Sequence, residues 1–183
     1  MTRTQEELPD SIEIRTASLA DCEAIKSFIA GLSLRARFLR FFTPASPPTP
    51  AVLRGLCGGG RTTDVLVATA GDAVIGHAMA ADSTGPDGGR VTDIGLVVAD
   101  DWQHRGVGSD LFGRVIARAA GRGVSALEME VLPENRPMLA IISRLWADAK
   151  YEYDGGSVTV RVPLAGGAPV PEGGGHGTAL RAA

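Results

Sequence analysis

One stretch of the chain, residues 91 to 112, constrains its fold more than any other. It contains an apolar run from Ile94 to Val98 that predicts a β-strand. A polar turn with Gly106 and Gly108 follows, and a helical pattern begins directly after the turn. The apolar residues of that pattern are spaced to share one helix face: Leu111, Phe112, Val115 and Ile116. The stretch therefore predicts a strand, a tight turn and a helix in succession.

The glycine pair lies where a chain can bind a phosphate group. Glycine lets the backbone approach a ligand closely, and the first N–H groups of a helix have no partner within the helix. The helix dipole adds partial positive charge at the same end. Arg105 can add a charge-assisted hydrogen bond to a phosphate oxygen. The turn therefore predicts an anion site.

Three phosphate-binding motifs compete for this turn, and their spacing separates them. A dinucleotide-binding motif needs a third glycine where this chain has Leu111, and a Walker loop needs a Gly-Lys-Ser or Gly-Lys-Thr sequence. The pattern that remains, Gln103-x-x-Gly106-x-Gly108, resembles the motif with which the GNAT superfamily of N-acetyltransferases binds the pyrophosphate of coenzyme A. On these six positions alone, a surface turn without a ligand is the alternative. The preceding strand and the matches described below favour the motif.

Length and composition fit one domain of ordinary size. The chain has 183 residues, of which 44% are hydrophobic, enough for one core, which we place at residues 12–164. We expect a flexible tail at 1–11 and a disordered Gly/Pro-rich tail at 165–183. No apolar run approaches the ~20 residues of a membrane helix, and the N-terminus does not resemble a signal peptide. We therefore expect a cytoplasmic protein that does not contact membranes.

Charge and cysteine content exclude several kinds of partner. A net charge of −3 argues against nucleic-acid binding and leaves room for a cationic substrate. Cys22 and Cys57 match no metal or redox spacing, so we expect both to be reduced. We predict no metal site. His77 lies in an apolar strand and is predicted to belong to the core.

The rest of the chain alternates between the two kinds of secondary structure. A proline-rich loop at 44–50 interrupts the pattern. The strand after the glycine turn is reached through a helix and should run parallel to its predecessor. Strand patterns occur at 12–15, 65–69, 74–80, 91–98, 125–131, 151–153 and 158–162, and helix patterns around 25–29, 32–42, 51–57, 108–122 and 138–145.

Three segments resemble one branch of the GNAT superfamily, the bacterial protein-lysine acetyltransferases (Pat-like). They are Leu34-Arg-Ala-Arg-Phe-Leu-Arg-Phe-Phe42, Val98 to Gly108, and Glu130-Val-Leu-Pro-Glu-Asn-Arg-Pro-Met138. The resemblance implies an α/β fold with one mixed sheet of about seven strands and about four helices, splayed between the fourth and fifth strands. It also implies acetyl-CoA as the cosubstrate.

The same resemblance implies which residues bind acetyl-CoA. Main-chain groups of Leu96, Val97 and Val98 would pair with the pantetheine arm as a strand-like partner. Asn135 matches an asparagine beside the pantetheine, although a turn-forming asparagine after Pro133 is the alternative. The pyrophosphate would lie among the residues of the turn: Gln103, His104, Arg105, Gly106, Val107, Gly108 and Ser109.

Asp93 occupies the position where the family often has a glutamate that acts as general base. A primary amine with a pKa near 10.4 is protonated at neutral pH, so a group must accept its proton before it can attack a thioester. Because Asp is shorter than Glu, we expect a relay through water. A structural role at the start of the strand is the alternative. Glu128 is the second candidate, since Glu130 recurs in the family resemblance.

The chain departs from the family in the helix after Asn135. Many members have a tyrosine seven positions further on that protonates the leaving thiolate, but this chain has Ile142. Ser143 or water could supply the proton, and the alternative is a reaction that needs no proton from the protein. Trp146 stands where the family often has glycine, which changes the volume on the acceptor side.

The residues therefore predict acetyl transfer from acetyl-CoA to a primary amine. The acidic chain narrowly favours a small polycationic amine, such as an aminoglycoside-type antibiotic. A protein lysine is the alternative acceptor, and a non-catalytic acyl-CoA sensor or interaction module is the alternative from another class. The sequence leaves a homodimer open.

Overall fold

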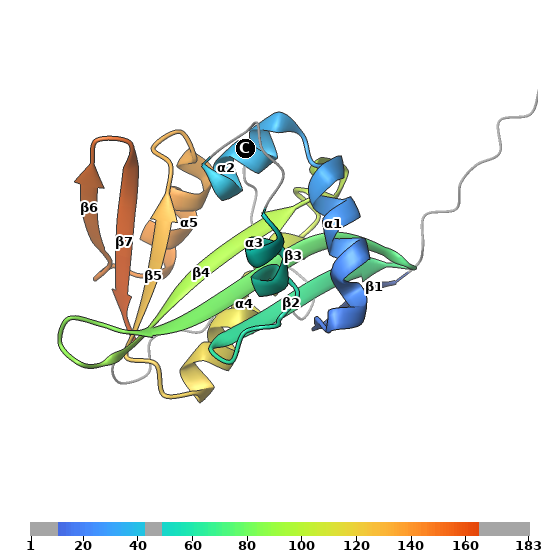
Figure 1. The fold of residues 1–183 in the computed structure, drawn as a ribbon. Helices are drawn as coiled ribbons and strands as arrows, with labels where there is room; N and C mark the ends of the chain where they lie inside the picture. The colour runs from blue at the N-terminus through green and yellow to red at the C-terminus, as the bar shows by residue number, and fades with distance from the viewer. Residues whose placement is uncertain (1–10, 43–48, 165–183) are drawn as a thin grey trace, which may run out of the picture.

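The computed structural model describes residues 11–42 and 49–164 (Figure 1). The tails expected at 1–11 and 165–183 lie outside these ranges, apart from residue 11, and so does most of the proline-rich loop. None of the described helices is long and apolar enough to cross a membrane.

A seven-stranded mixed sheet forms the middle layer of the molecule. The strands follow the spatial order β1-β2-β3-β4-β5-β7-β6, and all neighbours are antiparallel except β4 and β5. This confirms the predicted α/β fold, including the parallel strand after the long helix. The strands are β1 (Ile12–Thr16), β2 (Thr63–Ala70), β3 (Ala73–Thr84), β4 (Arg90–Val98), β5 (Ala126–Val131), β6 (Lys150–Asp154) and β7 (Ser157–Pro163).

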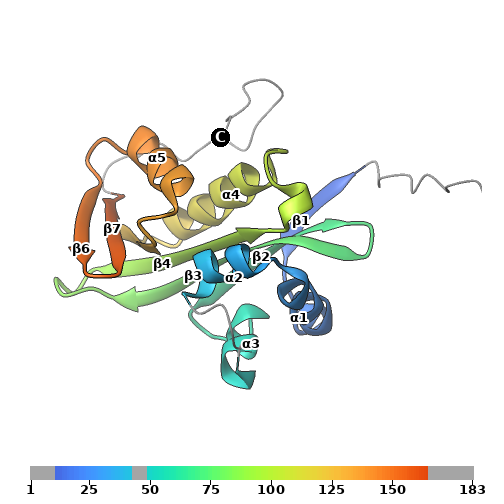
Figure 2. The same ribbon diagram turned by 90° about the horizontal axis from the view of Figure 1, so that it is seen from above.

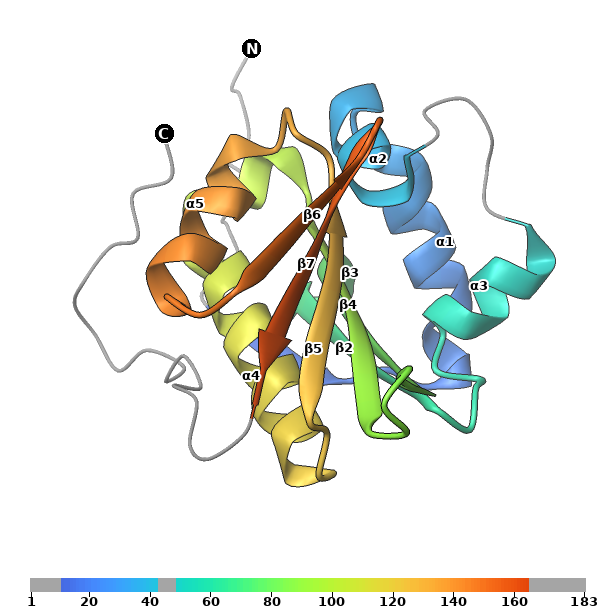
Figure 3. The ribbon, with the colours of Figure 1, turned by 90° about the vertical axis from the view of Figure 1, so that its left-hand side faces the viewer.

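Helices cover both faces of this sheet. Figures 2 and 3 show α1, α2 and α3 on one face and α4 and α5 on the other. The described residues form five α-helices, where the family resemblance implied about four. The helices are α1 (Cys22–Gly31), α2 (Leu34–Phe41), α3 (Pro50–Leu56), α4 (Val107–Gly121) and α5 (Arg136–Leu145).

The sheet separates two apolar layers. Leu111, Ile116 and Ile142 pack α4 and α5 on one face, and Ile25 and Phe28 pack α1 on the other. The middle strands β2, β3 and β4 are covered on both faces along part of their length, which accounts for their apolar stretches at residues 65–68, 74–76 and 94–98. His77 on β3 is buried in this middle layer, as predicted.

The sheet opens between β4 and β5. Only Val91, Thr92 and Asp93 pair with β5, whereas β4 pairs with β3 along its whole length. From Ile94 onward the two parallel strands diverge, as Figure 1 shows. This is the splay that the family resemblance implied, and it leaves one edge of β4 without a strand partner.

Helix α2 is anchored beside this opening at its N-terminus. The Ser33 hydroxyl accepts a hydrogen bond from the Ala36 N–H (3.1 Å) and thereby caps the helix. The Asp100 carboxylate, just beyond β4, accepts hydrogen bonds from the Ser33 hydroxyl (2.8 Å) and backbone N–H (3.2 Å). The helix therefore has a fixed position over the end of β4.

The two cysteines correct one expectation. Cys22, at the start of α1, and Cys57, directly after α3, form a disulfide with a Cα–Cα distance of 5.3 Å. We had expected both to be reduced because their spacing fits no motif. The pairing comes from the packing of α1 against α3, which the spacing of two cysteines along the chain does not reveal.

Candidate active site

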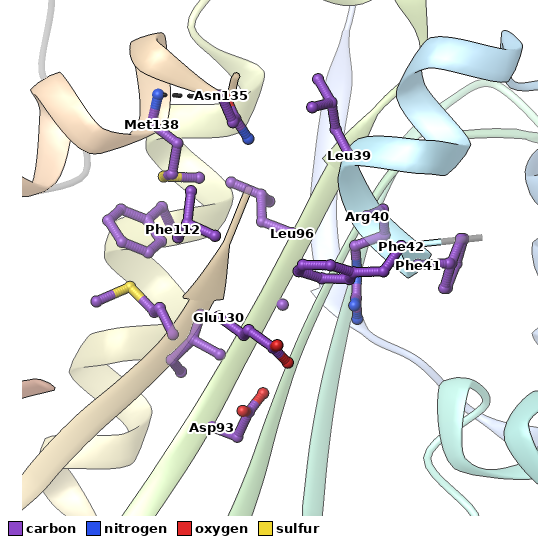
Figure 4. A pocket seen from close by; sticks show the side chains of 14 residues that line it. Leu39, Arg40, Phe41, Phe42, Asp93, Leu96, Phe112, Glu130, Asn135 and Met138 are labelled. Carbon is purple, nitrogen blue, oxygen red and sulfur yellow. Dashed lines mark hydrogen bonds between the residues drawn. The ribbon is translucent and has the colours of Figure 1, made fainter. Parts of the chain in front are cut away.

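A cleft of about 290 Å³ lies in the opening between β4 and β5 (Figure 4). Its floor is β4, and the end of α2, the strand β5 and the start of α5 form its walls. Its lining residues are Leu39, Arg40, Phe41, Phe42, Asp93, Ile94, Gly95, Leu96, Phe112, Met129, Glu130, Val131, Asn135 and Met138.

The glycine turn has the backbone geometry of an anion site. Gly106 precedes α4 with φ 87°, a left-handed conformation that glycine adopts without strain, and His104 also has a positive φ of 59°. The Gly106 carbonyl accepts the first helical bond, from the Asp110 N–H at 3.0 Å. Within the described residues no hydrogen bond reaches the N–H groups of Val107, Gly108 and Ser109. These donors remain available to a ligand.

The side chains of the turn have different roles. The Gln103 side-chain amide donates to the Val98 carbonyl (3.1 Å), so it fixes the turn against the end of β4. The Arg105 guanidinium lies over the Trp102 ring, with 5.0 Å between its Cζ and the ring centroid. His104 and Arg105 are exposed and can approach a phosphate from solvent.

The free edge of β4 presents alternate residues to the cleft. Because the Val98 carbonyl bonds Gln103, the main-chain groups of Val98 point away from β3. Directions alternate along a strand, so Leu96 shares this orientation, while the main chain of Val97 faces its partner His77 on β3. Of the three residues expected beside a pantetheine arm, Leu96 and Val98 thus present their main chains to the opening.

Asn135 lies on the opposite wall of the cleft. It is the N-cap of α5, and its side-chain oxygen accepts from the Met138 N–H at 3.4 Å (Figure 4). The structural role considered from sequence is therefore present. The side-chain NH₂ has no partner among the described residues and lies where it can donate into the cleft.

Asp93 stands at the end of the cleft, where β4 and β5 begin to separate. Its side chain is open to solvent through the cleft mouth, yet the surrounding protein removes enough hydration to raise its pKa above the usual value. The Arg40 guanidinium opposes this rise, while the Glu128 and Glu130 carboxylates add to it. A carboxylate with a raised pKa in a cleft is suited to accept a proton near neutral pH.

The sequence favoured Glu128 over Glu130 as the second candidate base, but in the structure Glu130 is the one that lies in the cleft. Glu128 accepts a hydrogen bond from Arg161 at 3.0 Å and does not line the cleft. Glu130 does line it, with its carboxylate turned toward that of Asp93 (Figure 4), and it accepts from the Ser157 hydroxyl at 2.8 Å. Sequence alternation placed both side chains on one face but could not distinguish them.

Neither the residue in the usual tyrosine position nor the candidate general acid Ser143 lines the cleft. Ile142, in the tyrosine position, is fully buried in the core, and Ser143 is exposed outside the cleft. Trp146 is also core, with its ring centroid 5.9 Å from that of Phe112 in an edge-to-face contact. Phe112 lines the cleft, so Trp146 affects its shape only through this contact.

Sequence analysis missed two lining residues of the cleft, Arg40 on the α2 wall and Gly95 on the β4 floor. Arg40 lay within a segment that was used only to identify the family branch. Gly95 interrupts an apolar strand, and a glycine inside a strand often marks a close approach by another group. That pattern was visible in the sequence but could not name the approaching side chain.

Buried His77 is not a candidate for proton transfer. Its Nε2 lies 2.8 Å from the Leu56 carbonyl, and burial lowers its pKa to about 4. It is therefore neutral at physiological pH. Within residues 11–42 and 49–164 no three His, Cys, Asp or Glu side chains are arranged to hold a metal ion.

A splayed mixed sheet with a free strand edge, a helix N-terminus at one end and a carboxylate at the other defines the class of acyl-CoA-dependent N-acyltransferases. The chain matches the acetyltransferase (GNAT) family over residues 33–145, and it belongs to that family. The family predicted from the sequence is thereby confirmed.

Solved structures share this fold. The GNAT domain of S. lividans PAT is 24% identical with a TM-score of 0.73, over 86% of this chain and 94% of that domain. A putative acetyltransferase from Salmonella typhimurium, solved with its cofactor acetyl-CoA, is 18% identical (TM-score 0.62) over 86% and 96% of the two chains. A putative phosphinothricin N-acetyltransferase is 18% identical (TM-score 0.66) over 85% and 100%.

Proposed function

We propose that this enzyme transfers the acetyl group of acetyl-CoA to a primary amine by direct attack, with Asp93 as general base. The observation that carries the proposal is the free edge of β4. It runs from Asp93, in the cleft, past Leu96 to Val98, and the turn that follows leads to the unbonded amides at the start of α4. Positioning two substrates along this edge would supply much of the rate acceleration.

The residues present fit acetyl-CoA. The N–H groups of residues 107–109, with His104 and Arg105, would hold the pyrophosphate, and Gln103 would keep the turn in place. Main-chain groups of Leu96 and Val98 would bind the pantetheine arm, with the Asn135 amide on the other side. The bound cosubstrate supplies an activated thioester.

Asp93 would accept the proton of the amine, directly or through a water molecule. The Val98 N–H would donate toward the thioester carbonyl and stabilise charge that develops on its oxygen. No described residue of the cleft is a tyrosine or cysteine that could protonate the sulfur. A thiolate of ordinary pKa near 8.5 is a moderate leaving group, so the reaction can proceed without such a residue.

The charge of the cleft favours a cationic acceptor. The Asp93 and Glu130 carboxylates converge there and outnumber the single guanidinium, that of Arg40, among the described lining residues. We favour a small polycationic amine of the aminoglycoside type. A protein lysine is the second candidate, favoured by the similarity to the S. lividans PAT domain. A cytoplasmic location agrees with either acceptor and with a supply of acetyl-CoA.

Thiol release from acetyl-CoA, measured with aminoglycosides, polyamines and lysine peptides, tests the proposal. We expect release that depends on the acceptor and is greatest with a small polycationic amine. A preference for peptides would replace the acceptor class but keep the reaction. Binding of acetyl-CoA without release on any amine would contradict the proposal and favour a non-catalytic acyl-CoA sensor.

A further inference from the structure

Arg40, in the last turn of α2, has a largely buried guanidinium group for which residues 11–42 and 49–164 supply no hydrogen-bond partner. Its Nε and Nη2 are inaccessible to solvent, and neither atom bonds any group within the described residues. No described carboxylate lies within 4 Å of it as an ion-pair partner. Burying a charge without partners is costly, so such a group requires an explanation.

The guanidinium occupies the space of a missing side chain. A Cβ atom built on Gly95 would collide with Cζ, Nη1 and Nη2 of Arg40. The Arg40 Cζ also lies 5.1 Å from the centroid of the Phe41 ring. In Figure 4 the Arg40 side chain runs from α2 toward β4. The Gly95 notch, meaning the space above the Gly95 Cα, thus holds the positive charge against the strand.

Asp93 lies on the same face of β4, two residues before the notch. Because side chains alternate along a strand, residues 93 and 95 point toward the same side of the sheet. Asp93 is the carboxylate whose charge acts on Arg40, and Arg40 in turn lowers the pKa of Asp93. Their interaction acts through space, since they form no direct ion pair.

The other charged groups around Asp93 are already compensated or add negative charge. Glu128 on β5 is paired with Arg161 of β7, and Glu130 accepts from Ser157. His77 on β3, behind Arg40, is neutral. Arg40 is therefore the cation that offsets the crowding of carboxylates at this end of the cleft.

We propose that Arg40 is a positioning residue for acyl transfer, a fixed counter-charge in the Gly95 notch that keeps Asp93 a carboxylate with its oxygens free. A direct ion pair would also keep Asp93 ionised, but it would occupy the oxygens that must accept the proton. Held in the notch, the guanidinium supplies the charge and leaves the base unbonded. This inference rests on the proposed function, in which Asp93 is the base.

The coupling can be measured without turnover, by ¹³C NMR titration of the Asp93 carboxyl in the full-length protein. In Arg40→Met the side chain remains long and apolar, and we expect the pKa of Asp93 to rise by about one unit. Arg40→Lys keeps the charge and should restore most of the wild-type value. Arg37→Met is the matched control. Arg37 lies one turn earlier on α2, also has a buried unpartnered Nε, and does not line the cleft.

The pH profile of kcat/KM then tests whether this coupling serves catalysis. We expect the acid limb to move upward with Arg40→Met by the same interval, and to stay at the wild-type position with Arg37→Met. Gly95→Ala retains the arginine but fills the notch, so we expect it to move the acid limb upward, as Arg40→Met does.

Two results separate the inference from the function on which it rests. If the pKa of Asp93 is equal in wild type and Arg40→Met, and the protein still acetylates amines, the counter-charge role of Arg40 is overturned but the proposed function stands. A wild-type protein that binds acetyl-CoA but acetylates no amine would overturn both. A rise in pKa that Arg37→Met reproduces would also reject the inference, because it would show a general effect of α2.

Discussion

At the scale of single residues, the chemistry depends on one carboxylate in an unusual environment. Asp93 is surrounded by enough protein to raise its pKa, with two glutamates adding to the rise and Arg40 limiting it. Its neighbour Glu130 shares the cleft, whereas Glu128 is held by Arg161. The roles of these three carboxylates follow from contacts across strands rather than from their order in the chain.

We expect Asp93→Asn to lower kcat/KM by about 100-fold or more, because the amine then loses its proton acceptor. The affinity for acetyl-CoA should change little, since no cofactor contact is removed. Because the folded pKa of Asp93 is raised, wild-type activity should fall as the pH drops through that raised value, above the ordinary ~3.9 of an aspartate. The substitution should abolish this limb.

Steady-state kinetics across pH, with equilibrium binding of acetyl-CoA, checks this prediction. Glu152→Gln is the control, because it changes an exposed carboxylate on β6 that does not line the cleft. Equal turnover of wild type and Asp93→Asn at neutral pH would remove Asp93 from the mechanism.

At the scale of elements, the strand-turn-helix unit of β4 and α4 organises the site. Residues 91–112 revealed this unit in the sequence because its apolar periodicity and glycines are local signals. The same signals correctly predicted α5 and the strands β2, β3, β6 and β7. Arg40, in contrast, reaches Gly95 from a different helix, and no local pattern encodes that contact. The disulfide between α1 and the end of α3 was missed for the same reason.

We expect Gly106→Ala to weaken acetyl-CoA binding by about tenfold. Gly106 has φ 87°, and an L-residue there costs about 1–2 kcal/mol, which the turn would relieve by reorienting the amides that follow it. Isothermal titration calorimetry measures the dissociation constant. Gly121→Ala, at the other end of α4 with open space around it, is the control. Equal affinities for the two variants would contradict an anion site at this turn.

At the scale of the whole molecule, the sheet carries a helical layer on each face. In the layer that contains α2, a disulfide links the start of α1 to the end of α3. The Cys22–Cys57 disulfide spans a sequence separation of 35 residues that contains α2 and its Arg40. The parallel crossover from β4 to β5 could be predicted because it follows from the order of local elements, whereas the splay was expected only from the resemblance to the family. The composition of the cleft could not, since it depends on how α2 docks on β4.

Reduction of the disulfide should lower the free energy of unfolding by about 3–4 kcal/mol, the chain-entropy value for a loop of this length. Urea denaturation of the oxidised and reduced wild-type protein measures this difference. A Cys22→Ala, Cys57→Ala double variant should have the free energy of unfolding of the reduced form, and adding reductant should not change it. Identical curves for oxidised and reduced protein would contradict a stabilising disulfide.

The central claim is that the free edge of β4 and the N-terminus of α4 form one continuous site for acetyl-CoA. A crystal structure of the complex tests it most directly. The account predicts the pyrophosphate at the amides of Val107 to Ser109, the pantetheine arm and its thioester end alongside Leu96 and Val98, and the acetyl group facing the end of the cleft that holds Asp93. A cofactor bound elsewhere, or those amides bonded to other protein groups in the complex, would contradict it.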